Sequence, residues 1–330
     1  MKTARKFMQL LAVIALVAIT PYATAEDKEP DKKKSLVERL GFPPNARVLI
    51  INADDFGMNH ATNVGTFKAM KAGGLTSATI MVPCPWFLEA AQFAKQNPQA
   101  NLGVHLTLTS EWKRYKWGPV AGRSAVPSLV DNLGYFYPDI FPIYRKARLE
   151  EVEKEVRAQI QQALAAGIDV THIDSHMGTL QYDQKYHELY IRIARDYNLP
   201  CRIAGLDLME PRGGGYLIKM ADDLGVLHPD MLYMGDPNTL EDTQRFWLGR
   251  LKQLQPGEVS EIFIHCGQET PEMEATCGSW RRRSADTKYF SSRKWLDAIK
   301  AEGIYLISYR QLRQLQRTGK ALPHKEFYGW

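Results

Sequence analysis

The chain has 330 residues, of which 45% are hydrophobic and 24% charged, and it carries a formal net charge of +5. These values are those of a globular protein, long enough for one large α/β domain or two smaller ones. The sequence has no basic stripe with interleaved aromatic residues, so we expect no binding to nucleic acid. The densest basic run of the later chain, Arg281–Arg283, is expected to lie in a solvated loop.

The first 25 residues have the pattern of a secretory signal peptide. A basic start precedes an almost wholly apolar run from Phe7 to Ile19, and Ala23-Thr24-Ala25 offers the small residues that a signal peptidase requires. The run is short for a membrane span, so we expect cleavage and no stable span in the mature protein, with an uncleaved anchor as the alternative. Loss of residues 1–25 removes three basic residues and no acidic ones, which lowers the net charge from +5 to +2. The protein is therefore expected to be exported, as a periplasmic or secreted protein.

A charged linker and a short helix occupy residues 26–46. The linker is rich in Lys, Glu and Asp, a composition typical of a disordered spacer. Leu36 to Leu40 can form a helix that Ser35 caps and that ends before Gly41.

Strand-like and helical segments then alternate along residues 47–310, and 311–330 are interpreted as a C-terminal tail. We expect strands at residues 47–51, 77–82, 102–106, 168–173, 200–204, 261–264 and 304–307. We expect helices at residues 59–73, 85–96, 149–166, 186–197, 239–254 and 292–302. Such alternation is typical of an α/β fold with a parallel sheet. About seven units favour a distorted (β/α) barrel in a single domain over an open doubly wound sheet.

Residues 110–145 are rich in Trp, Tyr, Gly and Pro and lack clear periodicity. Loops of this length in compact domains are usually functional or mobile. The aromatic side chains in it either stack on sugar rings or anchor the loop to the core, and the sequence leaves both interpretations open. They are Trp112, Tyr115, Trp117, Tyr135, Phe136 and Tyr137.

The chain has four cysteines, Cys84, Cys201, Cys266 and Cys277. In an oxidising compartment four cysteines allow three pairings, and Cys266 with Cys277 is the first to test because only a modest loop separates them. None has CxxC spacing, so a cysteine-based zinc site is not expected.

Acidic and imidazole side chains follow several of the predicted strands. The adjacent carboxylates Asp54 and Asp55 come after the strand at 47–51, and His105 and His176 lie at or near the ends of two later strands. The carboxyl ends of parallel strands gather at one edge of a barrel, so these groups are expected to meet in one pocket. Neighbouring carboxylates repel each other unless a cation or a shared proton relieves them. One carboxylate with two imidazoles is a ligand set typical of a catalytic divalent metal.

Four short motifs together resemble the YdjC-like carbohydrate deacetylases, which include chitooligosaccharide deacetylases and are related to polysaccharide deacetylases. The resemblance spans roughly residues 47–310, and its first three motifs, in this order, are specific. The motifs are Asn52-Ala53-Asp54-Asp55-Phe56-Gly57, Gly103-Val104-His105-Leu106-Thr107-Leu108-Thr109, Thr171-His172-Ile173-Asp174-Ser175-His176 and Ile264-His265-Cys266-Gly267.

The resemblance implies a distorted (β/α) barrel and a metal-dependent hydrolase that removes N-acetyl groups from oligo- or polysaccharides containing amino sugars. The implied ligands of a divalent metal are Asp55, His105 and His176, with zinc favoured by the two imidazoles and magnesium as the alternative. Asp54 is implied as the general base and His265, as an imidazolium, as the general acid.

Arg202 is implied as the residue that orients Asp54 or tunes its charge. The chain departs from the family pattern at two positions: Gly178 stands where members usually have a second histidine, and Cys266 stands where they have proline. The expected metal ligands survive both changes, whereas the usual contacts to a chitooligosaccharide are put in question. Asp174 is expected either to accept a hydrogen bond from a ligand histidine or to cap a turn.

His172 is expected to be structural, and the remaining histidines, His60, His187, His228 and His324, to lie on the surface or in loops. Two other functions stay open: a metal-dependent esterase or phosphoesterase acting on envelope glycans, and a noncatalytic glycan-binding protein that keeps the barrel and the aromatic loops. The partner expected is an N-acetylated glycan substrate, and a homodimer is the assembly that the sequence leaves open.

Overall fold

The computed structural model describes residues 34–323. The predicted signal peptide, most of the charged linker and the last seven residues, His324 among them, lie outside this range. The first described helix, α1 (Leu36–Arg39), begins at Ser35, whose side chain caps it as the sequence predicts. None of the described helices is long and apolar enough to cross a membrane.

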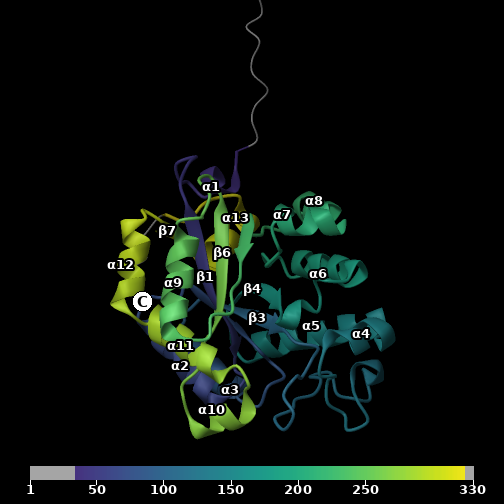
Figure 1. The fold of residues 1–330 in the computed structure, drawn as a ribbon. Coiled ribbons are helices and arrows are strands. Elements are labelled where there is room, and N and C mark those ends of the chain that lie inside the picture. The colour runs from purple at the N-terminus through teal and green to yellow at the C-terminus, as the bar shows by residue number, and fades with distance from the viewer. Residues whose placement is uncertain (1–33, 324–330) are drawn as a thin grey trace, which may run out of the picture. The chain divides into compact units, whose positions relative to one another are not determined.

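Seven parallel strands form one curled sheet in a single α/β domain, which confirms the predicted fold class (Figure 1). The order in the sheet is β4-β3-β2-β1-β6-β5, and β7 pairs with β1. Among the described residues no strand ladder joins β4 to β5, so the sheet forms part of a barrel and does not close. The strands are β1 (Val48–Phe56), β2 (Ser77–Ile80), β3 (Leu102–Leu106), β4 (Val170–Ser175), β5 (Met231–Tyr233), β6 (Val259–His265) and β7 (Tyr305–Leu306).

The central strand β1 is long enough to hold three neighbours. One edge pairs with β6 over the whole register from Val48 to Asp54. On the other edge, β7 pairs near the start of β1 and β2 pairs from Asn52 onward. β1 is also buried along its full length. It therefore holds the side chains near its carboxyl end in fixed positions.

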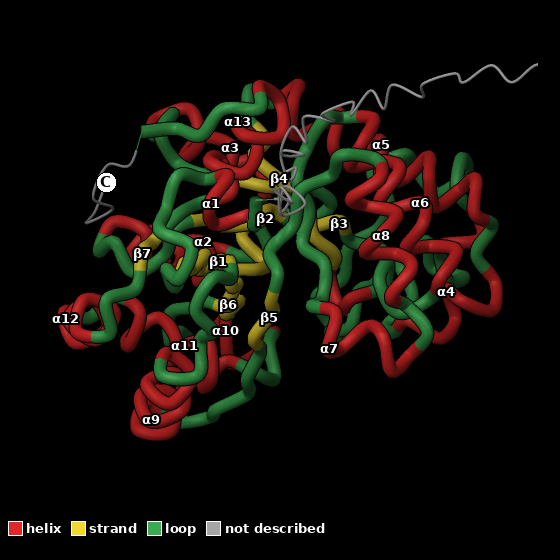
Figure 2. Tube along the Cα trace, turned by 90° about the horizontal axis from the view of Figure 1, so that it is seen from above, coloured by secondary structure: helices red, strands yellow, loops and turns green. Residues whose placement is uncertain are grey.

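Helices flank the curled sheet. Figure 2 shows α4, α5, α6 and α8 on the side of β3, and α9, α11 and α12 on the opposite side of the molecule. The helices beyond α1 are α2 (His60–Lys71), α3 (Phe87–Gln96), α4 (Ile140–Lys146), α5 (Leu149–Ala165), α6 (Gln184–Asp196), α7 (Leu206–Met209), α8 (Gly215–Asp223), α9 (Leu240–Leu251), α10 (Pro271–Thr276), α11 (Trp280–Phe290), α12 (Arg293–Ala301) and α13 (Tyr309–Thr318).

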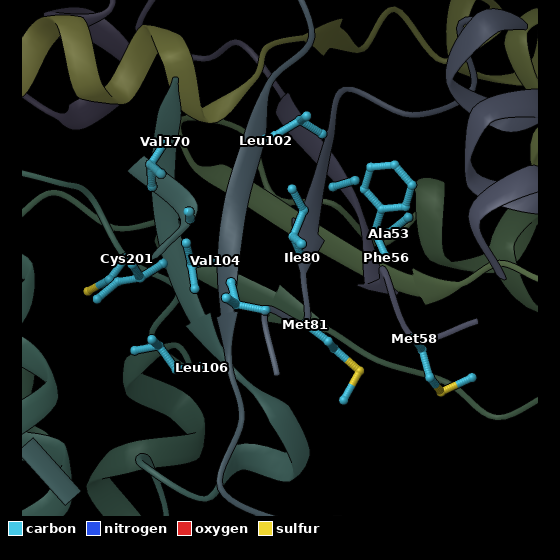
Figure 3. Close-up of a cluster of buried hydrophobic side chains, with 14 of the residues drawn as sticks. Ala53, Phe56, Met58, Ile80, Met81, Leu102, Val104, Leu106, Val170 and Cys201 are labelled. Atoms are coloured by element: carbon cyan, nitrogen blue, oxygen red, sulfur yellow. The ribbon is translucent and has the colours of Figure 1, made fainter. Parts of the chain in front are cut away.

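The main hydrophobic core lies between the sheet and these helices, and Figure 3 shows the part of it built by Phe56, Ile80, Val104, Leu106 and Cys201. A second cluster beneath β1 joins α1 to α13. All four cysteines are buried free thiols. The pairing of Cys266 with Cys277 that the sequence left open is therefore absent.

Two predicted strands differ from the observed ones. The first runs on to Phe56, so both aspartates lie inside β1 and not in a loop after it. The segment predicted as a strand at 200–204 makes a single bridge, from Cys201 to Ile173 of β4. The bridge is made by the neighbours of Cys201: the amide of Ile173 donates to the carbonyl of Pro200, and the amide of Arg202 donates to the carbonyl of Ile173. The amide of Cys201 points the other way and donates to the carbonyl of Leu227.

Two expectations about the later chain were wrong. Arg281–Arg283 lies in helix α11, and Arg283 is buried because it pairs with a buried carboxylate. His187 is buried within α6, so it is not a surface or loop histidine. The first part of the interpreted tail, residues 311–318, lies in helix α13 (Tyr309–Thr318), whose Tyr309, Leu312 and Leu315 are buried.

Candidate metal centre and active site

The site lies at the carboxyl ends of the strands. Asp54 and Asp55 come from β1, His105 from β3, His176 from the turn after β4, and His265 from the end of β6. All five line one cavity of about 580 Å³, together with Arg202 from the segment after α6. The six residues that the sequence suggested for chemistry are thus brought together.

A break in the β1 ladder turns both aspartates into this cavity. Successive side chains of a regular strand point to opposite faces of the sheet. Between Ala53 and Phe56, however, β1 has one residue more than its partner β2, which is a β-bulge. The backbone at Asp55 accommodates this extra residue. Its φ is 65°, in the left-handed region that most residues avoid. The bulge therefore lets Asp54 and Asp55 face the same space.

Asp55, His105 and His176 present three atoms at the corners of a nearly equilateral triangle. Asp55 Oδ1 lies 3.2 Å from His105 Nε2 and 3.2 Å from His176 Nδ1. The two nitrogens are also 3.2 Å apart. Tetrahedral zinc with bonds of about 2.0–2.2 Å holds neighbouring ligand atoms roughly 3.3–3.5 Å apart. The triangle therefore has the dimensions of three ligands of one divalent cation.

The hydrogen bonding of these atoms fits the same interpretation. Asp55 Oδ1 is buried and, in the part of the chain that the structure describes, accepts no hydrogen bond, even though both imidazoles are close. A buried polar atom without a partner is costly, so such an atom calls for a ligand. A cation bound by the three atoms would satisfy Asp55 Oδ1 and both nitrogens at once.

The outer nitrogen of each imidazole faces a carboxylate. His105 Nδ1 is 2.7 Å from Asp174 Oδ1, and His176 Nε2 is 3.0 Å from Glu111 Oε2. Ligand histidines in metal sites are typically oriented by such carboxylates, which set the tautomer and direct the other nitrogen at the metal. Asp174 therefore bonds to His105 from inside β4 and is not a turn cap. The sequence analysis missed Glu111, which lies six residues after His105 in the loop that leaves β3.

The pKa values of His105 and His176 are raised by the carboxylates around them. Burial by itself would lower the pKa of His105, but Asp174 and Asp54 raise it to about 10. Burial likewise opposes the rise at His176, where Glu111 and Asp55 bring the pKa to about 9. Carboxylates that stabilise a positive charge on these imidazoles would equally stabilise a bound cation.

Asp54 is held by a guanidinium. Arg202 Nη1 and Nη2 donate to its two carboxylate oxygens at 2.7 and 2.8 Å, and Asn52 Nδ2 donates to Oδ1 at 2.9 Å. Burial would raise the pKa of Asp54, but the charges of Arg202 and His105 hold it well below its ordinary value. Asp54 is therefore ionised at neutral pH and fixed in orientation.

A second cluster of side chains, Asp54, His105 and Asp174, also has the spacing of metal ligands. Its centre already holds a positive charge, since Arg202 Nη1 is 2.7 Å from Asp54 and 3.0 Å from Asp174. Arg202 also bonds to the buried Glu261. We therefore assign the metal to the triangle around Asp55 and the guanidinium to the cluster around Asp54.

His172 lies below the site and is structural, as expected from the sequence. Its ring stacks on Tyr309 with centroids 3.8 Å apart, and its Nε2 is 3.2 Å from Asn52 Oδ1. The stack needs Gly103 on the neighbouring strand, because a Cβ there would lie 2.6 Å from the His172 ring. Burial and the charge of Arg202 hold the pKa of His172 well below its ordinary value, so this ring is neutral.

His265 faces the cavity beside the triangle, with Nε2 3.9 Å from Asp55 Oδ2. Burial lowers the pKa of His265 to about 3, against the opposing charge of Asp55, and Arg283 adds to the lowering. The imidazole is thus neutral at neutral pH. The imidazolium expected from the sequence is not its resting form.

Arg283 is a residue of the site that sequence reasoning misassigned to a solvated loop. Its Nη2 donates to Asp55 Oδ2 at 2.5 Å, and its Nε donates to Ser279 Oγ at 3.1 Å. The buried residues of α11 are not confined to one face, since Arg283 to Thr287 are buried in succession together with Tyr289 and Phe290. Most of these residues are polar, so the sequence of the helix has no apolar stripe that could have placed Arg283 inside.

Most of the loop aromatics anchor the loop. Trp117 is buried and donates from Nε1 to the carbonyl of Thr109, and the hydroxyl of Tyr115 donates to the carbonyl of Met58. Of the six aromatic residues singled out from the sequence, Trp112 alone lines the cavity. At Gly178, the first departure from the family pattern, the ring of Tyr182 lies where a side chain would project, 2.6 Å from an added Cβ.

A family model described as YdjC-like protein matches residues 48–301. The chain belongs to the YdjC-like family. A carbohydrate deacetylase of Enterococcus faecalis is 35% identical over 80% of this chain and 97% of its own length. One from Thermus thermophilus is 36% identical over 78% of this chain and 89% of its own length.

A solved structure in the comparisons resembles the fold as well as the sequence. It is a crystal structure from Enterococcus faecalis titled a putative cellobiose-phosphate cleavage protein. The TM-score is 0.70 at 31% identity, with 81% of this chain and 99% of that chain covered. The similarity in fold extends over most of both chains.

Replacing the carboxylate behind a ligand histidine is expected to weaken metal binding without removing a ligand. In Asp174→Asn, His105 loses the charge that stabilises it as a ligand, and zinc affinity is expected to fall about 10- to 100-fold. His105→Ala should abolish stoichiometric binding. Zinc affinity is measured by competition with a chelator, with Asp223→Asn on the exposed face of α8 as the matched control. Unchanged zinc affinity in both site variants would show that the metal binds elsewhere.

Proposed function

We propose that this YdjC-like protein is a metal-dependent carbohydrate deacetylase that removes N-acetyl groups from oligo- or polysaccharides containing amino sugars. The observation that carries the proposal is the triangle of Asp55, His105 and His176 beside the ionised Asp54. The names of the two relatives, each similar over most of its length, support the same activity. Two imidazoles among three ligands favour zinc over magnesium.

The reaction would be hydrolysis of the amide C–N bond. The oxygen of water bonds to the acetyl carbon, the C–N bond breaks, and acetate and a free amine leave. A divalent cation bound by the triangle supplies two things: it lowers the pKa of a water molecule and polarises the acetyl carbonyl. The protein itself must take one proton from the water and give one to the amine.

Asp54 and His265 are the groups that we assign to these proton transfers. Asp54 is ionised and faces the cavity, so it can accept the proton of the attacking water. His265 pairs with Asp54 across the β1–β6 register and is neutral at rest. It must therefore gain its proton during the reaction, and we assign the proton taken up by Asp54 as the source. His265 then donates to the nitrogen of the leaving amine.

Arg202 has a positioning role in this scheme. Its two bonds to Asp54 keep the carboxylate ionised and aimed at the cavity. The same bonds make Asp54 a weak base, since its pKa is held well below the ordinary value. A weak base is adequate only if the water is already acidified, which is what a bound divalent cation provides.

We also propose that the protein acts after export, as a periplasmic or secreted enzyme. The support is the signal-peptide pattern of residues 1–25. Expression of the full chain followed by cell fractionation and N-terminal sequencing tests this. Mature protein that begins after Ala25 and lies outside the cytoplasm is expected, whereas uncleaved protein in the cytoplasm would refute it.

The function is tested by acetate release from N-acetylated glycans. We expect zinc-loaded protein to release acetate, and chelation to abolish the release. Asp54→Asn and His265→Ala should each lower kcat by about 10²- to 10⁴-fold, because each removes one proton-transfer group, while zinc content stays unchanged. The exposed Asp223→Asn and His60→Ala serve as matched controls. Release of phosphate in place of acetate, or glycan binding without turnover, would contradict the proposal.

A further inference from the structure

One donor beside the metal centre has no partner. Arg283 is buried, and two of its guanidinium nitrogens are engaged, Nη2 by Asp55 and Nε by Ser279. Its Nη1 is buried too, and no hydrogen bond to it is found among residues 34–323. A buried charged donor that stays unpaired is unfavourable, so this atom is expected to find an acceptor when the site is in use.

The cavity lies beside Arg283 and can supply the acceptor. The guanidinium is planar, so its bonds to Asp55 and Ser279 fix where Nη1 points. Arg283 and Ser279 both line the cavity, together with Asp55 and His265. A molecule that enters this space is therefore a source of an acceptor for Nη1.

The position of Nη1 relative to Asp55 indicates which part of the bound molecule accepts its hydrogen bond. Asp55 Oδ1 is a corner of the metal triangle, and Asp55 Oδ2 receives Arg283 Nη2 and lies 3.9 Å from His265 Nε2. Nη1 is bonded to the same guanidinium carbon as Nη2, so it lies close to the nitrogen that donates to Asp55. It carries two N–H groups, which can donate to one or two acceptor atoms of a bound molecule.

We propose that Arg283 Nη1 donates a hydrogen bond to the acetyl oxygen of the substrate, to the oxyanion that forms on it, and to the acetate product. This assignment rests on the proposed deacetylase function and adds a catalytic residue to it. A fixed cationic donor placed where negative charge develops stabilises the transition state more than the ground state. Loss of one such donor typically lowers kcat by about 10²- to 10³-fold.

The test uses Arg283→Lys, which keeps the charge and can still reach Asp55 but cannot also fill the position of Nη1. The matched control is Arg281→Lys, the same change two residues earlier on α11, where the side chain is exposed and stacks on Trp280. For each protein we would measure zinc content, kcat and KM, and the affinity for acetate by direct titration. The titration is repeated on protein stripped of zinc, so that a change in zinc affinity cannot decide the result.

The expected result is zinc-replete Arg283→Lys with kcat lowered about 10²-fold or more, KM changed little, and acetate affinity at least about tenfold weaker with and without zinc. Arg281→Lys should match the wild type. Wild-type acetate affinity in Arg283→Lys would overturn the assignment, as would a loss of kcat that added zinc restores in full, since Arg283 would then only position Asp55. Failure of the wild type to release acetate from any N-acetylated glycan would instead refute the proposed function. The acetate titration would still test whether Arg283 Nη1 binds acetate.

Discussion

Two consecutive buried carboxylates facing one cavity are the constraint on which this site depends. Asp54 and Asp55 both lie inside β1, and the bulge at Asp55 turns them to the same side. Each needs positive charge nearby, because unpaired buried carboxylates would protonate or destabilise the fold. Arg202 compensates Asp54. Asp55 has Arg283 on one oxygen, and its other oxygen lies between two imidazoles without a hydrogen bond. That asymmetry separates the proposed general base, Asp54, from the proposed metal ligand, Asp55.

The curl of the sheet makes the site possible. β1 and β4 are separated by β2 and β3, and neighbouring strands lie about 4.8 Å apart, so a flat sheet would put their ends roughly 14 Å from each other. Asp55 Oδ1 and His176 Nδ1 are nevertheless 3.2 Å apart. The sheet bends toward the cavity, and His176 lies one residue beyond the end of β4, where the chain turns inward through Met177 and Gly178 with positive φ. The strained turn and the bulge thus bring the ligands together from opposite sides.

The fold class could be predicted because strands and helices alternate clearly, and the site residues could be predicted because their motifs follow strands in a known order. The site residues and charge states that depend on contacts between distant segments could not be predicted from the sequence. Glu111 shows no pattern of its own, and only the fold brings it to His176. Arg283 was misread because three consecutive arginines are typical of a solvated segment, whereas the fold buries most of the helix that carries them. The neutral state of His265 depends on burial and on Arg283, neither of which local sequence reveals.

The central claim is that one divalent cation binds to Asp55, His105 and His176, with Arg202 occupying the neighbouring cluster around Asp54. Anomalous diffraction from zinc-grown crystals, recorded on both sides of the zinc absorption edge, tests it most directly. The account predicts one strong peak about 2.0–2.2 Å from Asp55 Oδ1, His105 Nε2 and His176 Nδ1. A peak between Asp54 and Asp174, with Arg202 displaced, or no peak in this cavity, would contradict it.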